Sequence, residues 1–120
     1  MVDGARAKAR ALVDALRPLA NAGIAFVGLE PSCLLTLRDE ALVMGLGEPA
    51  QVVAKQALLF EEFVARESEA GRFALPLKSA AAPILVHGHC HQKAFGAVSP
   101  ILDVLRLIPG AAPEVIDGSC

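Results

Sequence analysis

Apolar residues recur at helical spacing along the first part of the chain. Over residues 3–19 they stand three and four positions apart, with charged residues between them. This period predicts an amphipathic helix, and Asn21 and Gly23 supply its stop. The apolar run over residues 24–29 begins directly after that glycine, which is typical of a buried parallel strand.

The first strand leads into Glu30-Pro31-Ser32-Cys33 and then into a helical pattern over residues 34–42. Ser32 is the expected N-cap, which places Cys33 in the first turn of the helix. A thiol at that position feels the positive end of the helix dipole, which favours the thiolate needed for attack or metal ligation.

After Gly45, Gly47 and Pro49 the helical pattern resumes and predicts one helix from residue 51 to about residue 68. Its charged residues are expected to form a solvated face. These are Glu61, Glu62, Arg66, Glu67 and Glu69. Residues 71–83 are expected to be irregular, apart from a short extended piece at 73–75.

A second strand, Ile84-Leu85-Val86, delivers three histidines, a glycine and a cysteine at its carboxyl end. Alternation along an extended chain would put His87, His89 and His91 on one face and Cys90 on the other. A helix is predicted over residues 93–107, with its start weakened by Gly96 and the Ser99-Pro100 pair.

A third short strand at residues 114–116 leads to Cys120. The alternation of helix and strand predicts an α/β fold with a small parallel-type sheet and flanking helices. Each cysteine then follows a strand. Since ligands bind at the carboxyl ends of strands in open α/β sheets, Cys33, Cys90 and Cys120 can share one face.

Composition sets outer bounds. The 120 residues suffice for one small domain, and 54% are hydrophobic although Trp and Tyr are absent. A net charge of -2 gives no basic surface, so no nucleic-acid partner is expected. No apolar run reaches about 18 residues, and the first residues lack the pattern of a secretory signal. Three widely spaced cysteines favour a reducing cytoplasm over a secreted disulfide framework.

The residues alone leave several kinds of chemistry open. Cys33 can be an ordinary small core residue, and the histidines can be hydrogen-bonded surface residues. A zinc site lacks a Cys-x-x-Cys pair. A cysteine hydrolase using Cys33 or Cys90 with a histidine base has no local nucleophile signature in its favour. The chain contains neither a P-loop nor the dinucleotide-binding glycine pattern.

Three segments carry a resemblance to a known family. Residues 28–40, residues 86–94 and the final Ser119-Cys120 resemble successive signatures of the cysteine-rich region in FAD-linked oxidases of the D-lactate dehydrogenase and glycolate oxidase type. The same module is named for its Cys-Cys-Gly (CCG) motif. It also occurs in the iron-sulfur subunit of glycolate oxidase and in a subunit of heterodisulfide reductase.

The resemblance implies a set of metal ligands. Cys90 corresponds to the leading cysteine of one module and Cys120 to the first cysteine of its Cys-Cys-Gly, while Cys33 corresponds to the last cysteine of the preceding module. Glu30 stands where a further cysteine would be. Glu30, His89 and His91 are second-tier candidates for metal binding, and the two histidines are expected to position or tune Cys90 more than to bind metal themselves. The segment 1–120 is thus expected to hold parts of two modules. With only three of the cysteines, no cluster is expected on this segment alone.

The function that the resemblance implies is electron transfer. The parent would oxidise a 2-hydroxy acid, such as lactate or glycolate, at FAD in a separate flavin domain. The iron-sulfur region would then pass electrons to a quinone or another acceptor.

The expected location is cytoplasmic, with peripheral attachment of the parent to the inner face of the membrane. This segment is not expected to be active alone. Two alternatives stay open, a catalytic thiol and disulfide centre like heterodisulfide reductase, and a cluster-free scaffold. Self-association through exposed core surface is also expected.

Overall fold

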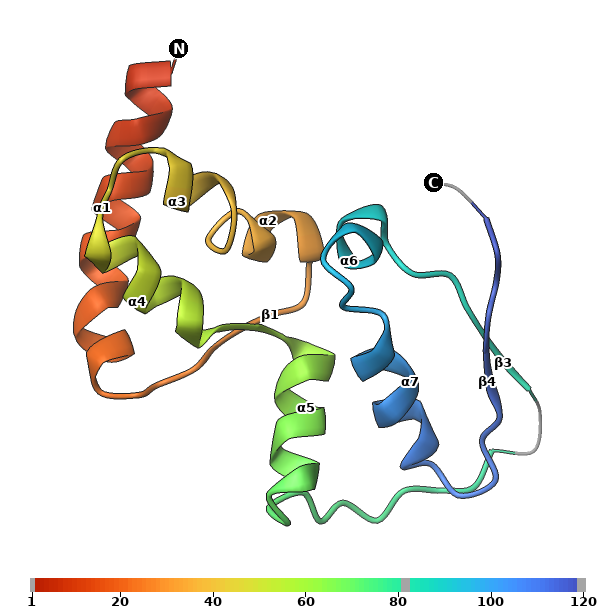
Figure 1. Cartoon of the computed structure of the whole chain (residues 1–120). Helices are drawn as coiled ribbons and strands as arrows, with labels where there is room; N and C mark the ends of the chain where they lie inside the picture. The colour runs from red at the N-terminus through yellow and green to blue at the C-terminus, as the bar shows by residue number, and fades with distance from the viewer. Residues whose placement is uncertain (1, 81–82, 119–120) are drawn as a thin grey trace. The chain divides into compact units, whose positions relative to one another are not determined.

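The computed structural model describes residues 2–80 and 83–118 and divides into two compact units. Unit 1 extends to Leu59, and unit 2 begins at Phe60. Each unit contains helices and one pair of short parallel strands (Figure 1). The predicted α/β class with parallel pairing is therefore confirmed, although the strands form two separate pairs in place of one sheet.

Unit 1 contains a long helix followed by a strand, three shorter helices and a second strand. Its elements are α1 (Val2–Asn21), β1 (Phe26–Gly28), α2 (Pro31–Leu35), α3 (Glu40–Val43), α4 (Glu48–Gln56) and β2 (Ala57–Leu59). The two strands pair in parallel, with Phe26 opposite Ala57 and Gly28 opposite Leu59.

The core of unit 1 lies between α1 and α4, which pack against each other (Figure 1). Val13 and Ala20 of α1 are buried against Ala50 and Val53 of α4. The predicted amphipathic helix is confirmed, and its polar residues stay on the exposed side. Helix α2 packs against β1 and β2, and its last residue, Leu35, is 2% exposed.

Unit 2 also begins with a helix followed by a strand, but only two helices, a short one and a longer one, precede its second strand. Its elements are α5 (Phe60–Glu69), β3 (Ile84–Val86), α6 (Cys90–Ala94), α7 (Ser99–Arg106) and β4 (Pro113–Val115). Ile84 lies opposite Pro113 and Val86 opposite Val115. Helix α5 packs against α7.

The prediction of one helix over residues 51–68 is wrong. The chain leaves α4 after Gln56, pairs as β2 with β1, and re-enters a helix at Phe60. The run Ala57-Leu58-Leu59 continues the helical spacing of apolar residues, so the sequence pattern does not reveal the break. Ala and Leu rank high as helix formers, but the free energy of that preference is small over three residues, and pairing with β1 outweighs it.

Two further predicted helices are divided. The helix over 34–42 is split into α2 and α3, and the helix over 93–107 is split into α6 and α7. In the second case the interruption falls where the sequence weakened it, because Gly96 takes a positive φ of 65° and Pro100 lies in the first turn of α7. The extended piece at 73–75 is not part of a strand.

Within the part of the chain that the structure describes, no helix combines the length and hydrophobicity needed to cross a membrane.

Candidate functional site

Cys33 lies in the first turn of α2, directly after β1, as predicted. The helix begins with Pro31, and Glu30 is its N-cap. The Glu30 carboxylate accepts hydrogen bonds from the backbone N–H of Ser32 at 3.0 Å and of Cys33 at 2.6 Å. The Ser32 hydroxyl also donates to this carboxylate, at 2.8 Å. One side chain therefore satisfies the exposed N–H groups that open the helix.

Two predictions for this turn are wrong. Ser32 is not the N-cap, because the longer Glu30 side chain reaches back over the helix start and takes that role. The thiolate of Cys33 is not favoured either: a hydrogen bond to Glu30 and the negative charge of that carboxylate raise the pKa of the Cys33 thiol. The carboxylate next to the thiol outweighs the dipole of a five-residue helix.

Glu30 itself is strongly acidic. Hydrogen bonds from the side chain and backbone of Cys33, followed by those from Ser32, lower the pKa of Glu30 to about 2. Glu30 is thus ionised and Cys33 protonated near neutral pH. The structure therefore brings Glu30 and Cys33 together as a carboxylate and thiol pair.

Cys90 is the first residue of α6 and is exposed. His89 is the N-cap, and its Nδ1 accepts the backbone N–H of His91 at 3.2 Å. The amide oxygen of Gln92 accepts the backbone N–H of His89 at 3.0 Å, which completes a capping box. The start of this helix is therefore fixed from both sides of Cys90.

The side chains of His89, Cys90 and His91 form the one potential metal-binding group among residues 2–80 and 83–118, with their donor atoms within 4.8 Å of one another. The predicted alternation of faces is wrong here, because the strand ends at Val86 and residues 90–94 are helical. The Cys90 sulfur lies 3.8 Å from His89 Nδ1. The same nitrogen accepts the backbone N–H of His91.

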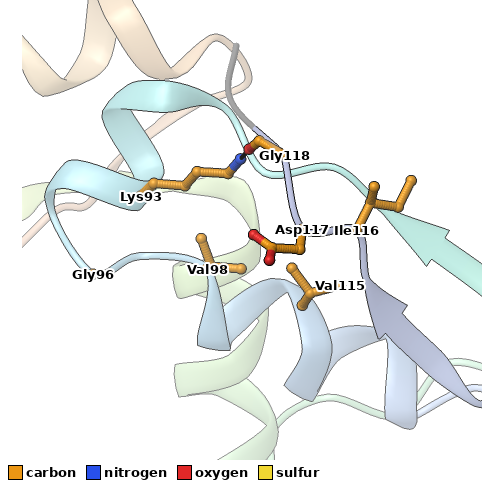
Figure 2. A pocket seen from close by; sticks show the side chains of 7 residues that line it. All are labelled: Lys93, Gly96, Val98, Val115, Ile116, Asp117 and Gly118. Atoms are coloured by element: carbon orange, nitrogen blue, oxygen red, sulfur yellow. Dashed lines mark hydrogen bonds between the residues drawn. The ribbon is translucent and has the colours of Figure 1, made fainter.

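A second tie joins α6 to the chain that leaves β4. Lys93 Nζ donates to the backbone carbonyl of Gly118. Figure 2 shows this side chain reaching across the edge of an open hollow of about 560 Å³, with the Asp117 carboxylate and Val98 at its wall. Gly88 lies beneath the Lys93 stem, and a Cβ there would come within 3.0 Å of Val98. The segment after β4 is therefore held close to the helix that carries Cys90.

The sequence pattern does not predict the hydrogen bonds that three residues around Cys90 make. Gln92 could have been found, because a Gln three residues after an N-cap is a known capping pattern. Lys93 carried no comparable signal. Glu61 was assigned to a solvated face, and that assignment is wrong because its carboxylate accepts a hydrogen bond from the Gln92 amide. Glu67 of the same face is also paired, with Arg72 at 2.6 Å and with Arg66 at 3.2 Å.

The number of cysteine thiols in each unit decides whether its residues can hold an iron-sulfur cluster. Such clusters are usually held by four cysteine thiolates. Of the residues described, unit 1 contributes Cys33 and unit 2 contributes Cys90, while Cys120 lies outside the described residues. Neither unit completes a cluster with its described residues. Each offers one exposed thiol at the start of a short helix.

Comparison with known proteins gives a similarity over nearly the whole chain. The chain is 29% identical over 119 residues, or 98% of its length, to a subunit of the anaerobic glycerol-3-phosphate dehydrogenase of Escherichia coli strain K12. The corresponding protein from Escherichia coli O157:H7 matches with the same identity and coverage. The chain spans 30% of the length of these curated relatives. No protein-family profile matches, and neither does any solved structure. The chain is thus similar to one part of a subunit of a dehydrogenase.

Proposed function

We propose that this chain is part of the electron-transfer portion of a dehydrogenase, in which Cys33 and Cys90 are iron-sulfur ligands. The observation that carries the proposal is the placement of the two described cysteines. Each is exposed in the first turn of a short helix that follows the first strand of a parallel pair. The similarity to a dehydrogenase subunit supports the same role.

The segment would hold parts of two successive modules, one in each unit, and the remaining ligands would come from Cys120 and from other parts of the parent. A bound cluster would supply one-electron transfer between the substrate-oxidising centre and an acceptor. The protein's own residues would present the thiols. Glu30 holds the turn before Cys33, and the capping box of His89 and Gln92 holds the turn at Cys90.

The substrate of the parent would be an anionic alcohol. The resemblance to FAD-linked oxidases suggests a 2-hydroxy acid such as lactate or glycolate, whereas the name of the curated relative points to glycerol 3-phosphate. Both carry a hydroxyl on a carbon that loses two electrons, together with an anionic group. FAD in a separate domain of the parent would accept those electrons, and a quinone or another carrier would be the final acceptor.

The setting of the parent is part of the same proposal. We place it in the cytoplasm, at the inner face of the membrane, where a quinone is accessible. Leu85 of β3 and Val115 of β4 are 64% and 47% exposed, which supports contact with another subunit or a second copy of the chain. Sedimentation of the purified chain over a range of concentrations would detect the second copy.

The proposed role is tested in the full-length parent. Cys90→Ser and Cys33→Ser should each reduce the iron content and the EPR signal of the protein and slow reduction of the acceptor. Reduction of the flavin by substrate should stay intact. Ser79→Ala, at an exposed position of unit 2, is a control that should change neither quantity.

Other outcomes would favour the alternatives. If both cysteine variants keep the EPR signal and acceptor reduction, and only stability changes, the region is a scaffold. If alkylation inactivates an iron-free preparation, the region is a thiol and disulfide centre. The raised pKa of Cys33 argues against that second outcome at this residue, because the thiol is the weaker nucleophile.

A further inference from the structure

Gln92 is the buried polar residue of unit 2 among those described, and both ends of its side chain are hydrogen-bonded. It is 7% exposed. A buried amide costs stability unless its donors and acceptor find partners. The partners of Gln92 therefore show what holds this side chain, and with it the first turn of α6.

The oxygen end of Gln92 faces the backbone at the start of α6. Oε1 accepts the N–H of His89 at 3.0 Å, and His89 directly precedes Cys90. This hydrogen bond fixes the backbone on the N-terminal side of the cysteine. A rotation of the Gln92 amide would release that N–H and loosen the turn.

The nitrogen end of Gln92 faces α5. Nε2 donates to Oε1 of Glu61, which lies in the first turn of α5. The carboxylate can only accept from this NH₂ group, so it selects one of the two orientations of the Gln92 amide. In that orientation the oxygen points at the N–H of His89. A hydrogen bond to an ionised carboxylate is also stronger than one between neutral groups.

We propose that Glu61 is a positioning residue for Cys90, acting through the Gln92 side chain and the backbone N–H of His89. The inference rests on the proposed function in so far as Cys90 is a ligand, and it adds a residue of another helix to that site. Glu61 touches neither the thiol nor a metal. Its effect is to hold the helix start that presents the thiol in one place.

The test measures the order at residue 90 directly with a nitroxide spin label. The full chain carries Cys33→Ser and Cys120→Ser, and the label is attached to Cys90. Glu61→Ala should shorten the rotational correlation time of the label at least twofold and raise hydrogen exchange at the His89 amide at least tenfold. Glu61→Gln should give intermediate values, because its amide group can present either its oxygen or its NH₂ group to Gln92 and no longer selects one orientation.

Two controls separate positioning from general stability. Glu69→Ala removes an exposed carboxylate from the same helix and should leave the label unchanged. A label on Cys33, in a chain with Cys90→Ser and Cys120→Ser, should not respond to Glu61→Ala. If Glu61→Ala prevents folding, Glu61→Asp keeps the charge on a shorter side chain and should still mobilise the label at residue 90.

The proposal is overturned if Glu61→Ala moves the label no more than Glu69→Ala does. It is overturned equally if exchange rises alike at all amides of unit 2. The measurement needs no iron. Failure of the proposed electron-transfer role would therefore leave the label results as expected, and an unresponsive label would leave that role intact.

Discussion

The Glu30 carboxylate accepts the backbone N–H of Cys33 at 2.6 Å and also raises the pKa of the Cys33 thiol. The same side chain thus builds the turn that presents the cysteine and keeps its sulfur protonated. A metal ligand must lose that proton on binding. A cation bound to the proposed ligand Cys33 would have to displace that proton, and the neighbouring carboxylate would then attract the cation.

Glu30→Gln should lower the pKa of the Cys33 thiol, because the negative charge beside it is removed. The amide oxygen of Gln can still accept from the helix start. Alkylation of Cys33 below its pKa should therefore become faster, while Cys90 in the same sample serves as the control. The rate of iodoacetamide modification is measured against pH, with peptides resolved by mass spectrometry. An unchanged profile at Cys33 would contradict this prediction.

Protonation of Glu30 should release the start of α2, but only at a pH below the range in which a glutamate ordinarily titrates. The pKa of Glu30 is lowered from 4.5 to about 2, so its stabilising contribution is fully present above pH 4.5 and is lost as the pH falls toward 2. NMR titration of the Glu30 side-chain carbon should give a midpoint near 2. The Ser32 and Cys33 amide resonances should shift with that midpoint, and a midpoint near 4.5 would show that the cap is absent.

Gly28→Ala should destabilise unit 1. A Cβ at this position would lie 2.8 Å from both Cβ and Cδ1 of Leu34, and Leu34 is only 8% exposed and cannot move away freely. We expect a loss of about 1–3 kcal/mol in the free energy of unfolding, measured by urea denaturation. Gly4→Ala is the matched control, because nothing lies within 4 Å of its Cβ position. A loss of the same size in both variants would rule out the close contact as the cause.

Leu35→Ala should remove most of a buried side chain of α2 and lower the free energy of unfolding by about 2–5 kcal/mol. Leu29→Ala deletes the same atoms at a position that is 83% exposed, and its effect should stay within about 0.5 kcal/mol. The two urea midpoints can be compared directly by circular dichroism. Equal shifts would mean that Leu35 is not buried between α2 and the two strands.

Much of the fold could be predicted from local pattern. The long helix α1 and the strands β1, β3 and β4 lie where apolar spacing placed them, to within a few residues. Strand β2 could not be found, because its three residues continue a helical spacing and become a strand only by pairing with β1. Pairing between distant segments is decided by tertiary contacts, which a window along the chain does not contain.

The candidate site was predicted in part. The position of Cys33 in the first turn of a helix after a strand follows from the order of elements. Cys90 was expected on extended chain after the second predicted strand, whereas it is the first residue of α6. The partners of these cysteines do not follow from the order of elements, because they depend on how far a side chain reaches. Glu30 reaches over three residues to displace Ser32 as the cap, and Glu61 lies in another helix, so neither role is written in the spacing of residues around the cysteine.

The parallel pairing of the strands has a consequence for the order of folding. Phe26 meets Ala57, and Ile84 meets Pro113, so each pair closes a loop of about thirty residues, whose entropy must be offset before the strands can stay together. Contacts within each helix are more local and form sooner, whereas α1 meets α4 and α5 meets α7 across separations at least as long as those of the strands. The strand ends that precede Cys33 and Cys90 are therefore completed late, so a metal at the two proposed ligands would bind only after each unit has folded.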